Sequence, residues 1–297
     1  WTGSLLPIHG VIGNTVRTSA GNFGYALELF SQTGAGFKTI DTTGDFTNGS
    51  DTGFVRNEPM LKLSWEPNTA RYQRFEAKIG STVMRANETY LGLTDADFAA
   101  NPYRRYAGSR FDNIDSNHTR SYVRHLWEAT PDTKLTTSLY TNRFHRDWFK
   151  LNVDGRDLLN SKIAVLKGQA AGTLAYRHNN RDYYSTGAQT TLTRDFTIAR
   201  GKHELDFGVR MNTDQERRLQ QNVTYTQNAS GVITGTANGA IGSGGNRLQE
   251  SSAWALSLSD KIQSDRWEIT PGIRYETIAY RYTDFNSPLG RTTQVDD

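Results

Sequence analysis

Arginine and histidine side chains in three polar segments are the groups in this sequence best suited to binding an anion. The segments are residues 140–148, residues 176–184 and the stretch that precedes Trp254. A guanidinium can donate two parallel hydrogen bonds to one carboxylate, so arginines that converge from several segments suit a ligand with several carboxylates. The candidate ligand-binding residues are Arg143, His145, Arg146, Arg177, Arg181 and Arg247.

These charges also have a simpler interpretation, which the sequence leaves open. Charged side chains in polar loops are commonly solvated, and Asp147 and Asp182 lie close enough in the sequence to pair with the same cations. Three further arginines, at positions 104, 105 and 110, occupy another polar segment and have the same two interpretations.

No motif typical of an enzyme is present. His203-Glu204 lacks the second histidine of a metalloprotease helix, and the glycine-rich run 239–245 lacks the Lys-Ser/Thr of a phosphate-binding loop. The six histidines are scattered and there is no cysteine. Asp45, Asn48 and Asp51 offer oxygen ligands for Ca²⁺, but turn-forming loops have the same composition. We therefore predict no catalytic residue, no metal site and no resident cofactor.

Composition excludes several classes of protein. The chain has 297 residues, a mean hydropathy of −0.65 and 11% aromatic residues. Disordered chains lack so many aromatic side chains. No stretch approaches the ~18 consecutive apolar residues that a membrane-spanning helix needs. The net charge is +3 and its arginines are dispersed, so the chain has no basic patch typical of a nucleic-acid partner.

The dominant pattern has a period of two, with an apolar and a charged residue in alternation. This pattern is typical of antiparallel strands with one apolar face. Several of these segments have twelve to fifteen residues, longer than the ~5–6 usual in globular proteins. About ten strands are predicted, at 23–33, 36–42, 54–66, 71–85, 117–129, 134–148, 172–196 (in one or two pieces), 202–213, 250–262 and 266–282.

Short and long connections alternate along the chain. The short ones lie near 67–70, 130–133, 199–202 and 263–266, and the long ones span 84–117, 143–171 and 213–249. Short turns at one rim and long loops at the other are typical of an outer-membrane β-barrel. Lipid penalises charged residues, so the apolar face should point outward and the charged face into a wet lumen. A soluble β-sandwich, with its apolar faces turned inward, is the alternative.

Helical periodicity is nearly absent. The one short helix predicted begins at Thr94, which can form a capping box with Asp97, and it ends before Pro102. Ten strands can close a small barrel, but the sequence begins and ends in irregular polar segments. A part of a larger barrel is therefore the preferred interpretation.

Several segments carry a resemblance to a known family. Residues 254–262, a short turn and residues 267–276 resemble a mid-barrel hairpin of TonB-dependent outer-membrane receptors. Residues 90–98 and 101–106 resemble an extracellular loop of the ferric-dicitrate type, and residues 201–210 are similar to a strand of the same group. The similarity runs from about Gly24 to Tyr282.

The resemblance implies a 22-stranded barrel that imports a ferric chelate, a siderophore or ferric citrate, with the iron arriving as part of the chelate. It implies a Gram-negative outer membrane as the location. Its partners are the chelate, outer-membrane lipid and the TonB complex, reached through a plug and a TonB box. We expect residues 1–297 to be a partial barrel domain that lacks the plug and the C-terminal strands. The alternative function is a self-contained ten-stranded outer-membrane barrel that acts as a protease or a pore.

Overall fold

The fold is one large antiparallel sheet with a cap of loops. The computed structural model describes residues 5–47, 50–153, 162–199, 201–287 and 292–296. Within these ranges, fourteen strands form the main sheet, and all of its strand pairs are antiparallel. They are β1 (Leu5–Thr18), β2 (Gly21–Gly34), β5 (Phe54–Pro67), β6 (Gln73–Ala86), β8 (Asn113–Thr130), β9 (Thr133–Leu151), β10 (Gly172–His178), β11 (Arg181–Ile198), β12 (Gly201–Gln227), β13 (Ile233–Asn238), β14 (Gly245–Gln263), β15 (Glu268–Ile269), β16 (Gly272–Asp284) and β17 (Thr292–Asp296).

The remaining elements lie in the long loops. A three-stranded sheet has the order β4 (Ser50–Asp51), β3 (Thr39–Ile40) and β7 (Arg104–Arg105). The helices are α1 (Asp95–Ala100), α2 (Ile163–Leu166) and the 3₁₀ turn η1 (Ala107–Ser109). None of the described helices is long and apolar enough to cross a bilayer.

Most of the predicted strands are confirmed, but β12 continues to Gln227, well beyond the predicted end at residue 213, and β13 and β17 were not predicted. Two further corrections concern the first 42 residues. The segment 36–42 contains only the two-residue β3, which lies outside the main sheet. The N-terminal segment, expected to be irregular, forms the fourteen-residue strand β1. Pro7, Gly10 and Gly13 weaken its sequence pattern. Among the described strands, β1 pairs only with β2, at one edge of the sheet. An edge strand tolerates proline because one side needs no ladder hydrogen bonds.

The described strands form an open sheet rather than a closed ring. Their order runs from β1 at one edge to β17 at the other, and no pair joins these two strands within the described ranges. A self-contained ten-stranded barrel would require such a closing pair. The described part of the chain therefore does not adopt the alternative barrel.

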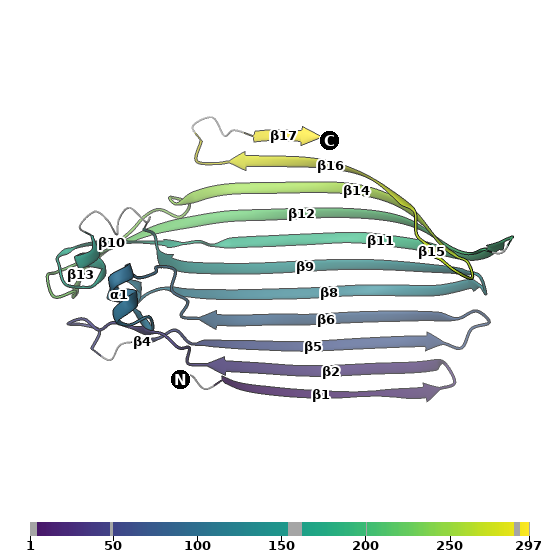
Figure 1. Cartoon of the computed structure of the whole chain (residues 1–297), viewed down its shortest axis with the longest axis horizontal. Coiled ribbons are helices and arrows are strands. Elements are labelled where there is room, and N and C mark those ends of the chain that lie inside the picture. The colour runs from purple at the N-terminus through teal and green to yellow at the C-terminus, as the bar shows by residue number, and fades with distance from the viewer. Residues whose placement is uncertain (1–4, 48–49, 154–161, 200, 288–291, 297) are drawn as a thin grey trace.

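Connections sort by length between the two ends of the sheet. The turns β1–β2, β5–β6, β8–β9, β11–β12 and β14–β15 gather at the right of Figure 1, whereas the helices and β13 lie at the left. We call the end that carries the helices and β13 the loop rim, and the end that carries these turns the turn rim. The predicted gathering of the short turns near 67–70, 130–133, 199–202 and 263–266 at one rim is confirmed. The loop rim holds the long loops, together with a short turn at 228–232 between β12 and β13.

Register separates the side chains into two faces. Leu63 pairs with Ala77, Ala77 with Val123 and Val123 with Leu139, so one face carries apolar side chains. The adjacent residues Lys62, Lys78 and Tyr122 likewise pair across the sheet on the opposite face. We call these the apolar face and the polar face. The predicted alternation of apolar and charged residues is confirmed. The register places on the apolar face Leu61, Leu63, Trp65, Phe75, Ile79, Val209, Met211, Ile269 and Ile273. It places on the polar face Arg74, Glu76, Lys78, Glu204, Arg210, Arg274 and Glu276.

The two faces differ in exposure. On the apolar face Leu139 is 56% exposed and Ile273 is 71% exposed. On the polar face Glu76 is only 9% exposed, because Lys62 lies 2.9 Å from it and Tyr122 donates a hydrogen bond of 2.5 Å. Side chains are therefore crowded on the polar face and spread apart on the apolar face. This difference is expected for a curved sheet whose polar face is concave.

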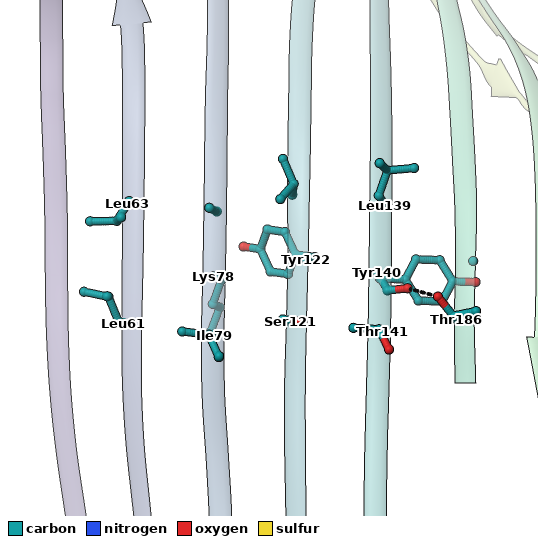
Figure 2. A pocket seen from close by; sticks show the side chains of 13 residues that line it. Leu61, Leu63, Lys78, Ile79, Ser121, Tyr122, Leu139, Tyr140, Thr141 and Thr186 are labelled. Carbon is teal, nitrogen blue, oxygen red and sulfur yellow. Dashed lines mark hydrogen bonds between the residues drawn. The ribbon is translucent and has the colours of Figure 1, made fainter. Parts of the chain in front are cut away.

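A hollow lies in the middle of the apolar face. Leu61, Leu63 and Ile79 stand on one side of it and Leu139 on the other, with Ser121 between them (Figure 2). Two more small side chains line it, Thr141 on the same strand as Leu139 and Thr186 on the next strand, β11. Its volume is about 560 Å³. We call it the central hollow.

An aromatic row crosses the apolar face near the turn rim. The ring centroids of Phe23 and Trp65 are 5.9 Å apart, those of Trp65 and Phe75 5.5 Å, and those of Phe75 and His125 4.3 Å. Four neighbouring strands contribute one ring each. Aromatic side chains at this depth are typical of a membrane-interface girdle.

The buried apolar core lies under the long loops. Tyr106, Leu151, Leu166, Leu174 and Tyr176 are each at most 2% exposed, and they belong to one cluster that joins the loops to the ends of β9, β10 and β12. The core does not lie between two packed sheets. The apolar side chains in mid-sheet are instead exposed, so the sandwich alternative is not supported.

The predicted short helix is confirmed, together with its cap. Thr94 is the N-cap of α1, its hydroxyl accepts from the Asp97 amide at 3.2 Å, and α1 ends at Ala100. The Asp97 carboxylate also accepts from Tyr106 at 2.7 Å and pairs with Lys167 at 2.8 Å. One capping residue thus joins the loop 87–112 to the loop that carries α2.

Candidate ligand-binding site

Four arginines form a row across the polar face near the loop rim. Arg146 on β9 pairs with Arg181 on β11, Arg181 pairs with Arg218 on β12, and Arg218 pairs with Arg247 on β14. Directly paired residues of antiparallel strands lie on the same face, about 5 Å apart. We call this row the arginine ladder. Three of its members were predicted from the sequence and Arg218 was not.

Among the described residues, the ladder has fewer carboxylate partners than guanidiniums. Glu216 lies 3.3 Å from Arg181 and 3.5 Å from Arg218, and Asp284 lies 3.2 Å from Arg247. The Arg181 Nε atom is buried and has no hydrogen-bond partner among the described residues. A buried donor without an acceptor is costly, so the ladder retains capacity for an additional anion.

Two more cations extend the ladder toward the loops. Arg177 on β10 pairs with Lys150 on β9 and with Asn222 on β12, which places it on the same face as Arg181. Its Nε donates to Asn222 at 2.7 Å. The Lys150 ammonium lies 3.2 Å from the centre of the Tyr90 ring, and Arg146, Arg177 and Arg181 all act on it electrostatically. The positive charge is therefore concentrated at one place on the polar face.

A cavity adjoins the ladder on the side toward mid-sheet. Its volume is about 410 Å³, and its lining includes Phe144, Tyr183, Glu216 and Tyr280. Phe144 and Tyr183 stack at 5.6 Å, and the Tyr183 hydroxyl accepts from Arg181 at 3.2 Å. Glu216 lines the cavity and also pairs with the ladder, so the cavity and the cations form one continuous site. Aromatic walls with a few charged groups are the usual composition of a small-molecule site.

Arg143 and His145 do not lie with the other candidates. They occupy odd positions of β9, whereas Arg146 occupies an even one, and alternate residues of a strand point to opposite faces. His145 pairs with Asp182 at 2.7 Å, and the Arg143 guanidinium lies 5.6 Å from the centre of the Tyr184 ring. The expectation that all six candidates converge is therefore wrong for these two, which belong to the apolar-face side of the sheet.

Of the three arginines after α1, Arg104 and Arg110 join one loop to another, whereas Arg105 donates to carbonyls of its own loop. Arg104 pairs with Asp41 at 2.6 Å, Arg105 donates to the carbonyl of Pro102 at 3.1 Å, and Arg110 pairs with Asp45 at 3.1 Å. The Arg110 side chain is only 2% exposed. These interactions match the structural interpretation of the loop cations.

The calcium candidates are not brought together as a ligand set. Asp45 also accepts from the Ile233 amide at 2.8 Å, and Asp51 accepts from the Gly53 amide at 3.0 Å. Asn48 lies outside the described residues. Within the described ranges, no group of three or more His, Cys, Asp or Glu side chains is placed to hold a metal ion.

Asp112 is a buried carboxylate that sequence reasoning missed. It is 3% exposed, and its Oδ1 accepts from the Leu151 amide at 2.6 Å. Burial raises the pKa of Asp112 to about 7, although the Leu151 and Tyr90 amides and the nearby Lys150 charge favour its ionised form. Asp112 lies between Phe111 and Asn113 in an ordinary polar loop, which offers no signal of burial.

Comparisons with known proteins give matches at the level of structure. No family model matches the sequence, and neither does any curated protein. The unliganded ferric citrate transporter FecA matches with a TM-score of 0.71 and 17% identity, over 99% of this chain and 40% of that chain. The ferric-catecholate import receptor Fiu from E. coli K12, in its open form, matches with a TM-score of 0.63 and 13% identity, over 99% and 48%.

The siderophore receptor PiuA from Acinetobacter baumannii matches with a TM-score of 0.64 and 10% identity, over 99% of this chain and 44% of that chain. The chain thus spans less than half the length of each of these receptors. Its sheet has the fold of an outer-membrane β-barrel receptor. More particularly, the structural neighbours are TonB-dependent siderophore and ferric citrate receptors, which confirms the resemblance seen in the sequence at the level of fold.

Proposed function

We propose that residues 1–297 form part of the barrel of a TonB-dependent receptor in a Gram-negative outer membrane, and that this receptor takes up an anionic ferric chelate, a siderophore or ferric citrate. The observation that carries the proposal is the arginine ladder beside an aromatic-walled cavity on the polar face. Under this proposal, the plug and the TonB-contacting segment belong to residues outside 1–297. The function is binding and transport, with iron as part of the cargo.

The chemistry of the ladder fits such a ligand. A ferric polycarboxylate presents several anionic oxygens, and each charge-assisted hydrogen bond contributes about 1.5–3 kcal/mol. Three such bonds near the upper end of this range are enough to bring the dissociation constant to about 1 μM. Aromatic side chains such as Phe144 and Tyr183 supply apolar contact for the organic part of the chelate.

The test is a calorimetric titration of the intact receptor with ferric citrate. We expect the triple variant Arg146→Ala/Arg181→Ala/Arg247→Ala to lose at least tenfold in affinity, because it removes three of the four ladder guanidiniums. Arg143→Ala is the matched control: it lies on the same strand as Arg146 but on the other face, and its affinity should stay within twofold of wild type. Circular dichroism and the shift in electrophoretic mobility on heating check that each variant assembles.

Unchanged affinity of the triple variant for ferric citrate and for a ferric catecholate would remove the ladder from the binding site. An equal loss in Arg143→Ala would point to a general effect of charge rather than to this face of the sheet.

A further inference from the structure

A second pocket lies on the apolar-face side of the sheet, close to the loop rim. Its volume is about 370 Å³, and Asn117, Thr119, Arg143, His145, Tyr184 and Arg217 line it. Register places these residues on one face, since Arg143 pairs with Thr119 and Tyr184, and Asp182 pairs with both His145 and Arg217. We call it the rim pocket. It is separated from the arginine ladder by the thickness of the sheet.

The rim pocket continues the central hollow toward the loops. Ser121 and Thr141 line the central hollow, and Thr119 and Arg143 line the rim pocket two residues further along the same strands. Arg143 is four residues beyond Leu139 on β9. At ~3.3 Å per residue and a tilt of about 40°, the guanidinium lies roughly 10 Å beyond the apolar side chain along the membrane normal. That offset corresponds to the distance from acyl chains to headgroups.

The charge of the rim pocket is positive and incompletely paired. Among the residues that line it, Asp182 is the only carboxylate, and it pairs with His145. Neither Arg143 nor Arg217 has a carboxylate partner within the described part of the chain. Arg143 rests on Tyr184, whereas Arg217 lies 4.8 Å from the centre of the Phe285 ring and donates to the Arg247 carbonyl at 3.2 Å. Both guanidiniums keep donors available for a phosphate.

We infer that the rim pocket binds the phosphorylated headgroup of an outer-leaflet lipid, and that an acyl chain of the same lipid occupies the central hollow. Two guanidiniums bind the phosphate, and Asn117 and Thr119 provide further polar contacts. The small side chains of the central hollow leave space for an acyl chain where larger residues would fill it. This inference rests on the membrane placement in the proposed function, but it uses the opposite face of the sheet from the chelate site.

The test uses the intact receptor in a neutral detergent, with native mass spectrometry to count bound molecules. The probes are dioctanoyl phosphatidic acid, dioctanoyl phosphatidylcholine and inorganic phosphate. We expect tight binding of phosphatidic acid only, and at least a tenfold loss of affinity in the variant Arg143→Gln/Arg217→Gln. The matched control is Arg120→Gln/Arg210→Gln, which removes two arginines from the polar face of neighbouring strands and should bind phosphatidic acid as wild type does.

Each other outcome overturns the inference. Equal loss in the control would show a non-specific charge effect. Binding of inorganic phosphate as tight as that of phosphatidic acid would show an anion site without a lipid. If the double glutamine variant does not assemble, Arg143→Lys/Arg217→Lys provides the second test: it keeps the charge and should retain measurable phosphatidic acid binding. Chelate affinity is read from the ladder variants, so the proposed function and this inference can fail separately.

Discussion

Burial controls the ionisation of Asp112, whose pKa of about 7 lies well above the usual value of 3.8. Between these two values the folded loop keeps a proton that the unfolded loop releases. The loop is therefore most stable at acidic pH, and its stability falls as the pH rises through the window from about 4 to 7. The full effect is at most roughly 4 kcal/mol, at 1.36 kcal/mol per pKa unit.

Asp112→Asn should abolish this pH dependence. The asparagine keeps an acceptor for the Leu151 amide but does not titrate. Hydrogen exchange of the Leu151 and Tyr90 amides, corrected for intrinsic rates, measures the local stability from pH 5 to pH 8. Wild type should lose protection across this range and the variant should not. The same slope in both proteins would contradict the assignment to Asp112.

At the residue scale, the sequence identified the correct residue types but only part of their arrangement. Arg146, Arg181 and Arg247 were predicted and do form one row. Arg143 was grouped with them because it is three residues from Arg146, although an odd separation along a strand reverses the face. Arg218 was missed because β12 extends to Gln227, well beyond the predicted end at residue 213. Its register with β11 and β14 depends on partners far apart in the sequence.

At the element scale, Gly187 on β11 gives room to a ring from the next strand. A Cβ atom at this position would lie 2.4 Å from the Tyr140 hydroxyl and 2.5 Å from the Met211 carbonyl oxygen. The Tyr140 hydroxyl donates to Asn212 at 2.6 Å and accepts from Arg210 at 3.0 Å. The glycine thus permits a tyrosine to bridge from β9 to β12 over the polar face of β11.

Gly187→Ala should destabilise the sheet by about 1–3 kcal/mol, the usual cost of overpacking. Gly10→Ala is the matched control, because an added Cβ on β1 has no neighbour within 4 Å. Urea unfolding of the receptor in lipid vesicles, followed by tryptophan fluorescence, measures both. If the two alanine variants unfold at the same urea concentration, the close approach of Tyr140 has no energetic role.

Strands were predicted correctly where apolar and charged residues alternate over a long run. They were missed where proline or glycine interrupts that alternation. The central strands β5, β6, β8, β9 and β14 were found because charged and apolar residues alternate over a long run. β1 was missed because the tolerance of an edge for proline and glycine becomes apparent only once the sheet order is known.

At the scale of the whole molecule, the described sheet has two edges with unpaired backbone groups, at β1 and β17. Long exposed edges favour association with other strands. Expressed by itself, the 297-residue chain should therefore be insoluble without detergent. It should also lack the shift in electrophoretic mobility on heating that closed barrels show. Light scattering and unheated gels measure both properties, and a monodisperse soluble monomer would contradict this prediction.

Trp65, in the aromatic row near the turn rim, is sensitive to the pairing of the strands around it. Trp65 stacks between Phe23 and Phe75, so three strands adjacent in the sheet contribute to the surroundings of one indole. Its emission wavelength and its exciton coupling to neighbouring rings are set only when β2, β5 and β6 are in register. In a variant whose other five tryptophans are replaced, Trp65 is therefore a spectroscopic probe of strand alignment, and no added label is needed to follow the assembly of this part of the sheet in a bilayer.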